Sequence, residues 1–89
     1  MRDVRLRRMA RYYLHINNGG GYSEDSEGQE LADLDAARAA AIEGVRSLLS
    51  EEARQGQLDL SGRIEIADAE GNILLIVPFS DAVELRRHG

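Results

Sequence analysis

Histidine is the residue type in this chain that exchanges protons near neutral pH, and it occurs only at His15 and His88. A general base also needs a nucleophile and a positioning partner. The chain has no cysteine, no lysine and no Gly-Xaa-Ser-Xaa-Gly segment, so those signatures of covalent catalysis are missing. A zinc site would need several carboxylates beside the two histidines. We therefore expect no catalysis, no cofactor and no metal, and interpret His15 as a structural or surface residue.

Carboxylates gather in a second stretch, where six acidic residues and no basic residue lie between positions 22 and 35. Alignment of Gly28 with the glycine of a calcium-binding loop places Asp25 and Glu27 at ligand positions. The bidentate glutamate of such a loop is missing, because Leu34 stands at its position. The sequence therefore favours a solvated acidic hairpin. Its possible contact residues for a partner protein are Glu24, Asp25 and Glu27.

Basic residues concentrate at the N-terminus, although the whole chain carries a net charge of −5. Residues 1–8 form a predicted flexible basic arm, which can bind phosphate through salt-dependent contacts. The arm has no aromatic residue to stack on bases, so a solvated tail is the simpler interpretation, as it is for residues 86–89. The arginines of a possible nucleic-acid interface are Arg2, Arg5, Arg7 and Arg8.

Alternation of apolar residues over positions 9–17 predicts a strand whose outward face carries Tyr13 and His15. Asparagines and glycines at 17–21 predict a hairpin turn. Residues 22–25 would return as a short acidic edge strand, and extended structure would resume just before a helix.

Apolar residues at spacings of three and four predict one long helix over residues 33–55. Asp33 or Asp35 would cap its start, and Gly56 would end it. Gly44 weakens a helix interior, and we expect a close backbone approach to require it. The apolar stripe consists of Leu34, Ala37, Ala41, Ile42, Val45, Leu48 and Leu49.

Two more strands are predicted at residues 62–68 and 73–79, joined by a tight hairpin. The last strand is apolar on both faces, which is typical of a central strand, so we place it with the first strand in the middle of the sheet. Ser80 or Asp81 would then cap a short helix ending at Leu85.

These elements predict a single α+β domain over residues 9–85, in the order strand-strand-helix-strand-strand. The four-stranded, mainly antiparallel sheet would carry the long helix on one face and a short C-terminal helix. Because one helix covers one face, the second apolar face of the last strand would be covered by the terminal helix or by a second copy of the chain. We favour a two-fold homodimer, which would bury Leu74 and Ile76.

We therefore predict a non-enzymatic protein-interaction domain that self-associates and binds an unidentified protein partner. The alternatives are a nucleic-acid-associated or antitoxin-like regulator that uses the basic arm, and a small ligand-binding protein or enzyme centred on His15. The lack of cysteine fits a reducing cytoplasm, and no apolar run is long enough to span a membrane.

Several segments together resemble a known family. They are RYYLHI at residues 11–16, residues 28–31 and 34–38, and VPFSDAV at residues 77–83. Over residues 10–85 the chain resembles a family of short alphaproteobacterial proteins classed only as a domain of unknown function. This resemblance implies a small cytoplasmic α/β domain with no known activity. The hairpin before one alanine-rich helix is also similar to the partial ribonuclease-H-like domain of HicB-type antitoxins.

Overall fold

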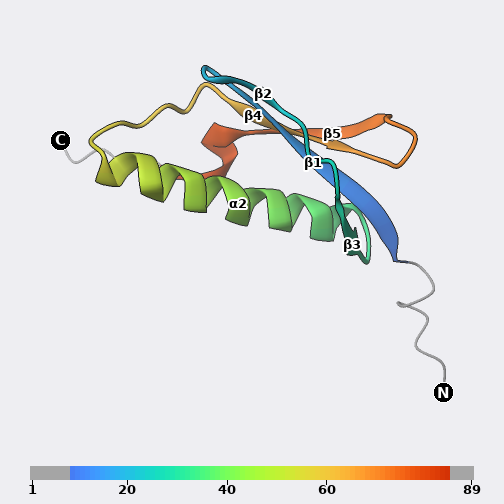
Figure 1. Cartoon of the computed structure of the whole chain (residues 1–89). Helices are drawn as coiled ribbons and strands as arrows, with labels where there is room; N and C mark the ends of the chain where they lie inside the picture. Colours follow the sequence, from blue (N-terminus) through green and yellow to red (C-terminus); the bar gives the residue numbers. More distant parts are fainter. Residues whose placement is uncertain (1–8, 85–89) are drawn as a thin grey trace.

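The structure is a computed structural model that describes residues 9–84 (Figure 1). The predicted arm at residues 1–8, the predicted helix end at Leu85 and the tail at 86–89 lie outside the described residues. The elements are β1 (Ala10–Asn18), β2 (Gly21–Ser23), β3 (Gln29–Leu31), α2 (Leu34–Arg54), β4 (Arg63–Ala67), β5 (Ile73–Pro78) and the 3-10 turn η1 (Phe79–Ala82).

Within residues 9–84, five strands form one antiparallel sheet. Four of them lie in the order β2-β1-β4-β5, and the fifth, β3, pairs with β1 further along the edge where β2 lies. The long helix α2 lies across one face of this sheet (Figure 1). The predicted α+β fold is therefore confirmed. The returning segment differs in detail, because it forms two three-residue strands, β2 and β3, with a break between them.

The predicted strand order is wrong for the last strand. β5 lies at an edge, because β4 pairs with both β1 and β5 and so takes the central position. β4 carries charged residues on the face away from the helix, and these neutralise each other, with Arg63 Nε 3.1 Å from Glu65 Oε2. A strand that is apolar on both faces, as β5 is, can therefore lie at the edge of a sheet. At this edge some of the apolar side chains of β5 remain in contact with solvent.

α2 begins and ends where its sequence signals predict. The Asp33 carboxylate accepts a hydrogen bond from Ala36 N at 2.8 Å, so Asp33, and not Asp35, is the cap. Gly56 follows the helix with a φ of 83°, a conformation that favours glycine. The buried residues of the helix are Ala37, Ala41, Ile42, Val45 and Leu49.

The core lies between α2 and the sheet. Ile64 and Ile66 of β4 and Val77 of β5 point into it, and Phe79 of η1 is fully buried at one end. A Cβ on Gly62 would lie 2.7 Å from the Phe79 ring, so this position accepts only glycine without a shift of the ring.

Two smaller expectations are corrected. A Cβ on Gly44 would meet nothing within 4 Å, so no close backbone approach requires this glycine. The predicted terminal helix is the short turn η1, which has no side-chain cap. Helix α2 holds this turn in place instead, because Arg46 Nε donates to Ala82 O at 2.8 Å and Arg38 pairs with Asp81 at 3.5 Å.

A search for membrane-spanning helices over residues 9–84 finds none with the length and apolar character that a bilayer crossing requires.

Candidate functional site

The sheet face away from α2, called the outer face here, carries most of the predicted site residues. Paired residues on neighbouring antiparallel strands point to the same face. His15 of β1 pairs with Glu65 of β4, which pairs with Ile76 of β5, so these three side chains form one row across the outer face. Tyr13 lies on the same face, next to His15 along β1.

The edge of β1 has a gap between its two short partners. Between the Ile16–Ser23 pair and the Tyr12–Gln29 pair, β1 advances by four residues while the returning chain advances by six. Residues 24–28 therefore leave the sheet as a loop, and the middle of β1 has no strand beside it on this edge. Some other group must accept the backbone N–H that points into the gap.

The Asp25 side chain fills this gap. Its Oδ2 atom accepts from Leu14 N at 3.1 Å, and its Oδ1 atom accepts from Gly28 N at 3.0 Å and Glu27 N at 3.3 Å. Its own backbone N–H donates to His15 Nδ1 at 3.0 Å. Asp25 thus joins the loop to β1 through two hydrogen bonds, with Leu14 and His15, and holds the loop in shape through two more, with Glu27 and Gly28.

Gly28 closes the loop against β1 in a conformation that only glycine adopts readily. Its φ is 68°, and a Cβ there would lie 2.8 Å from the Tyr12 carbonyl oxygen and 2.9 Å from the Tyr13 ring. Any other residue at this position would push the loop away from the strand.

The hydrogen bonds to Asp25 also set its charge. Burial alone would raise the pKa of this carboxyl group, but the backbone N–H groups of Gly28, Leu14 and Glu27 outweigh that effect, and His15 acts in the same direction. The pKa of Asp25 is therefore below its ordinary value, and the group is ionised at neutral pH.

His15 lies on the face that the alternation predicts, but it is not a surface residue. It is only 8% exposed, because the loop folds over it and the Tyr22 ring lies 5.8 Å from its ring. The ring of Tyr13, which also belongs to β1, stacks with the His15 ring at a centroid distance of 6.5 Å. Since Nδ1 accepts a hydrogen bond from Asp25, the neutral ring carries its proton on Nε2. Among the described residues nothing accepts that proton, and His15 lines a space beside the loop.

That space is a polar hollow of about 320 Å³, called the His15 hollow here. Four predicted interaction residues meet in it: Tyr13, His15, Glu24 and Asp25. The rest of its lining was not predicted, because it combines the loop with the distant β4–β5 hairpin, which lies beside β1 only in the folded sheet. These additional residues are Ser26, Asp68, Ala69 and Gly71.

Asp68 brings a further fixed negative charge to the His15 hollow. Its carboxylate accepts from Asn72 N at 2.9 Å, from Asn72 Nδ2 at 3.1 Å and from Glu70 N at 3.0 Å. The backbone and side-chain hydrogen bonds from Asn72 hold the pKa of Asp68 below its ordinary value. The group is therefore ionised at neutral pH.

The other predicted site residues lie elsewhere. Glu27 is exposed in the loop but does not line the His15 hollow. Leu74 and Ile76 lie on β5, where they are 42% and 50% exposed, next to Ile73 at 48%. The arginines of the predicted arm, Arg2, Arg5, Arg7 and Arg8, lie outside the described residues.

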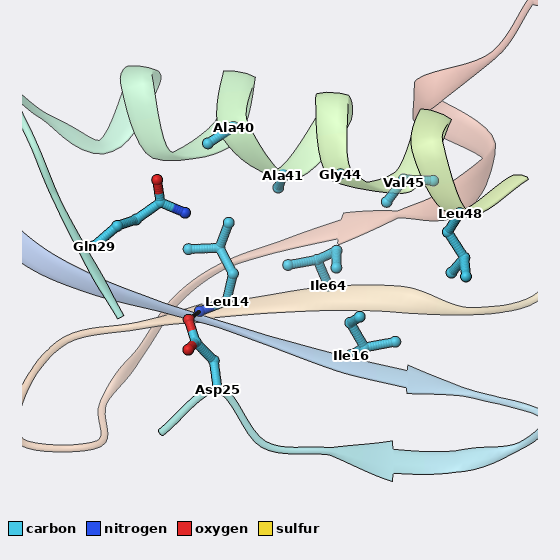
Figure 2. Close-up of a pocket in the computed structure, with 10 residues that line it drawn as sticks. All are labelled: Leu14, Ile16, Asp25, Gln29, Ala40, Ala41, Gly44, Val45, Leu48 and Ile64. Carbon is cyan, nitrogen blue, oxygen red and sulfur yellow. Dashed lines mark hydrogen bonds between the residues drawn. The ribbon is translucent and has the colours of Figure 1, made fainter. Parts of the chain in front are cut away.

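A second cavity, of about 250 Å³, lies between α2 and the sheet (Figure 2). Leu14 and Ile64 point into it from the sheet, opposite Ala40 and Gly44 of the helix. Its lining is mainly apolar, and the Asp25 oxygens at its border already accept backbone hydrogen bonds. This cavity is an under-packed flank of the core and offers no reactive group.

Within residues 9–84, no three histidine or acidic side chains are arranged to hold a metal ion. Neither a search of curated proteins nor a search of solved structures found a significant match to the chain. Residues 11–80, by contrast, match the family described as Domain of unknown function (DUF6894). Because this match covers most of the chain, the protein belongs to the DUF6894 family of domains of unknown function.

Proposed function

We propose that this protein is a non-enzymatic interaction domain that forms a homodimer through the free edge of β5. The observation that carries the proposal is the character of that edge. β5 has no charged residue between Ile73 and Pro78, and three of its apolar side chains are about half exposed. Monomeric proteins usually protect an exposed edge strand with charges, because an uncharged edge pairs readily with another chain.

The backbone of β5 supports pairing with a second copy. Phe79 N donates to Gly62 O at 2.9 Å, and bonded pairs alternate along antiparallel strands. The N–H and C=O groups of Ile76 therefore point away from β4, toward the free edge. Pro78, which has no N–H to donate, occupies the equivalent outward position two residues later. Two β5 strands related by a two-fold axis would satisfy the Ile76 groups of both copies and bring the Ile76 side chains together.

The opposite edge of the sheet is a poorer surface for self-association. Its strands β2 and β3 have three residues each. Glu24 and Glu27, which make no ion pair with the described residues, are exposed along this edge. Like charges would repel a second copy there.

The mass of the full chain in solution tests the proposal. Sedimentation equilibrium at tens of micromolar should give about twice the 9.8 kDa of one chain. On dilution the mass should fall toward that of one chain, as expected for a reversible dimer. A mass of one chain at every concentration up to the millimolar range would rule out the dimer.

Two alternatives have weaker support. A nucleic-acid-associated regulator would depend on Arg2, Arg5, Arg7 and Arg8, while the carboxylates of the His15 hollow would repel phosphate. Ser26 also lines the His15 hollow, but within residues 9–84 no hydrogen bond joins its hydroxyl to His15, which favours binding over catalysis. A cytoplasmic location, an alphaproteobacterial origin and the similarity to HicB-type antitoxins remain predictions from the sequence.

A further inference from the structure

Acidic residues dominate the charge of the His15 hollow. Glu24, Asp25 and Asp68 line it, and no arginine does. On the neighbouring β2 strand, desolvation and then the charges of Glu65 and Glu24 raise the pKa of Tyr22, in the direction expected beside acidic groups. An anionic ligand would be repelled from this site, and a cationic group would be attracted.

Of the three carboxylates, Glu24 is the one that accepts no hydrogen bond from the described residues, so both of its oxygens are fully available to a ligand. Both oxygens of Asp25 and both oxygens of Asp68 accept hydrogen bonds from the protein. Glu24 makes no hydrogen bond or ion pair with the described residues, and its side chain is exposed at the rim. A free carboxylate of this kind can take a guanidinium group through two parallel hydrogen bonds.

The hollow also presents a hydrogen-bond donor and aromatic rings. His15, which is only 8% exposed, lines the hollow, and its Nε2–H has no hydrogen-bond partner among residues 9–84. The Tyr13 ring, which is tilted by only 18° from the His15 ring, forms the adjoining wall. A bare cation offers nothing to the Nε2–H, so the best-fitting ligand combines a cation with a nearby hydrogen-bond acceptor.

We propose that the His15 hollow binds an arginine residue in a peptide segment of a partner protein. The guanidinium group pairs with Glu24 and lies against the Tyr13 ring, while a carbonyl of the peptide backbone accepts from His15 Nε2–H. Arginine is favoured over lysine because its planar cation stacks on aromatic rings and bonds a carboxylate in bidentate fashion. The inference rests on the proposed interaction function and specifies the chemistry of the partner.

A titration with a small peptide tests this proposal on the full chain. The probe is acetyl-Ala-Arg-Ala-amide, and its neutral isostere has citrulline in place of arginine. In a nitrogen-15 NMR titration at low salt, the arginine peptide should cause saturable shifts of the amides of Tyr13, Glu24, Ala69 and Gly71. The citrulline peptide should bind at least about tenfold more weakly than the arginine peptide, because it lacks the charge that pairs with Glu24.

Two variants separate the specific site from general attraction. Glu24→Gln should weaken the arginine peptide about tenfold. Glu70→Gln removes the same charge from the neighbouring hairpin, but Glu70 does not line the hollow, so the affinity should stay within about twofold. His15→Asn keeps an acceptor near the position of Nδ1 for the Asp25 amide and removes the Nε2–H donor, so it should weaken binding with little change in melting temperature.

Three results would overturn the proposal: equal affinity for the arginine and citrulline peptides, equal weakening by Glu24→Gln and Glu70→Gln, or tighter binding of a single-stranded oligonucleotide at the same amides. If His15→Asn does not fold, the two glutamate variants still decide the question. None of these results depends on the mass of the protein, so failure of the peptide site and failure of the β5 dimer can be told apart.

Discussion

Replacing Asp25 with alanine is expected to lower the free energy of unfolding by about 2–3 kcal/mol at neutral pH. The substitution removes the acceptor of three backbone N–H groups, those of Leu14, Glu27 and Gly28. Two of them are partly buried, and no other described group is placed to accept from them. Urea unfolding followed by circular dichroism measures the change.

The matched control for this substitution is Asp35→Ala, which removes an exposed carboxylate from the first turn of α2. Asp35 has no side-chain hydrogen bond among the described residues, so the loss should stay within about 0.5–1 kcal/mol, from the helix dipole alone. If Asp25→Ala cost no more than this control, Asp25 would not be the residue that joins the loop to β1.

The effect of Asp25→Ala should also depend on pH. The pKa of Asp25 is lowered in the folded state, so ionised Asp25 stabilises the fold. This contribution is fully present above the unfolded-state pKa of about 3.9 and is lost as the pH falls through the lower folded-state pKa. The stability difference between the original chain and the variant should therefore be constant from about pH 5 to 8 and shrink below about pH 4. A difference that stayed constant down to pH 2 would contradict this assignment.

Ile76→Lys is expected to dissociate the dimer. Ile76 lies at the centre of the proposed pairing, and its substitution places two like charges against each other across the two-fold axis. A central interface residue of this kind contributes about 2 kcal/mol or more, so the dimer Kd should rise about thirtyfold or more. Since Ile76 is 50% exposed and lysine is common on edge strands, the fold should tolerate the change. Sedimentation equilibrium at tens of micromolar should then give the mass of one chain.

Leu58→Lys provides a matched control for Ile76→Lys. Leu58 is 57% exposed and lies in the connector between α2 and β4, away from the proposed interface. This variant carries the same change in charge and should remain dimeric. Equal behaviour of the two variants would mean that net charge, and not the β5 edge, controls association.

The helix was predictable because its signals are local. α2 repeats its apolar spacing over 21 residues, and Asp33 and Gly56 mark its two ends. The alternation of β1 also assigned Tyr13 and His15 correctly to one face. These features need only the helix and strand periods and the chemistry of capping, all of which are encoded within a few residues.

The errors arose where distant segments meet. The apolar sequence of β5 is compatible with a central strand and also with an edge strand that pairs with another chain. Only the pairing of β4 with both β1 and β5 distinguishes these two positions. The burial of His15 depends on the loop at residues 24–28, which leaves the sheet beside β1 because the register shifts by two residues. The contribution of Asp68 to the His15 hollow follows from the hairpin returning beside β1. No local period encodes these contacts.

Amide hydrogen exchange at Ile76 tests the β5 dimer most directly. Its N–H points to the free edge, whereas the neighbouring N–H of Val77 points toward β4 and should be protected at any protein concentration. If two β5 strands pair, the Ile76 amide should exchange slowly at high protein concentration and faster as the protein is diluted below the dimer Kd. If Ile76 exchanges at the rate of an open edge at every concentration, the β5 edges do not pair and the proposed dimer is wrong.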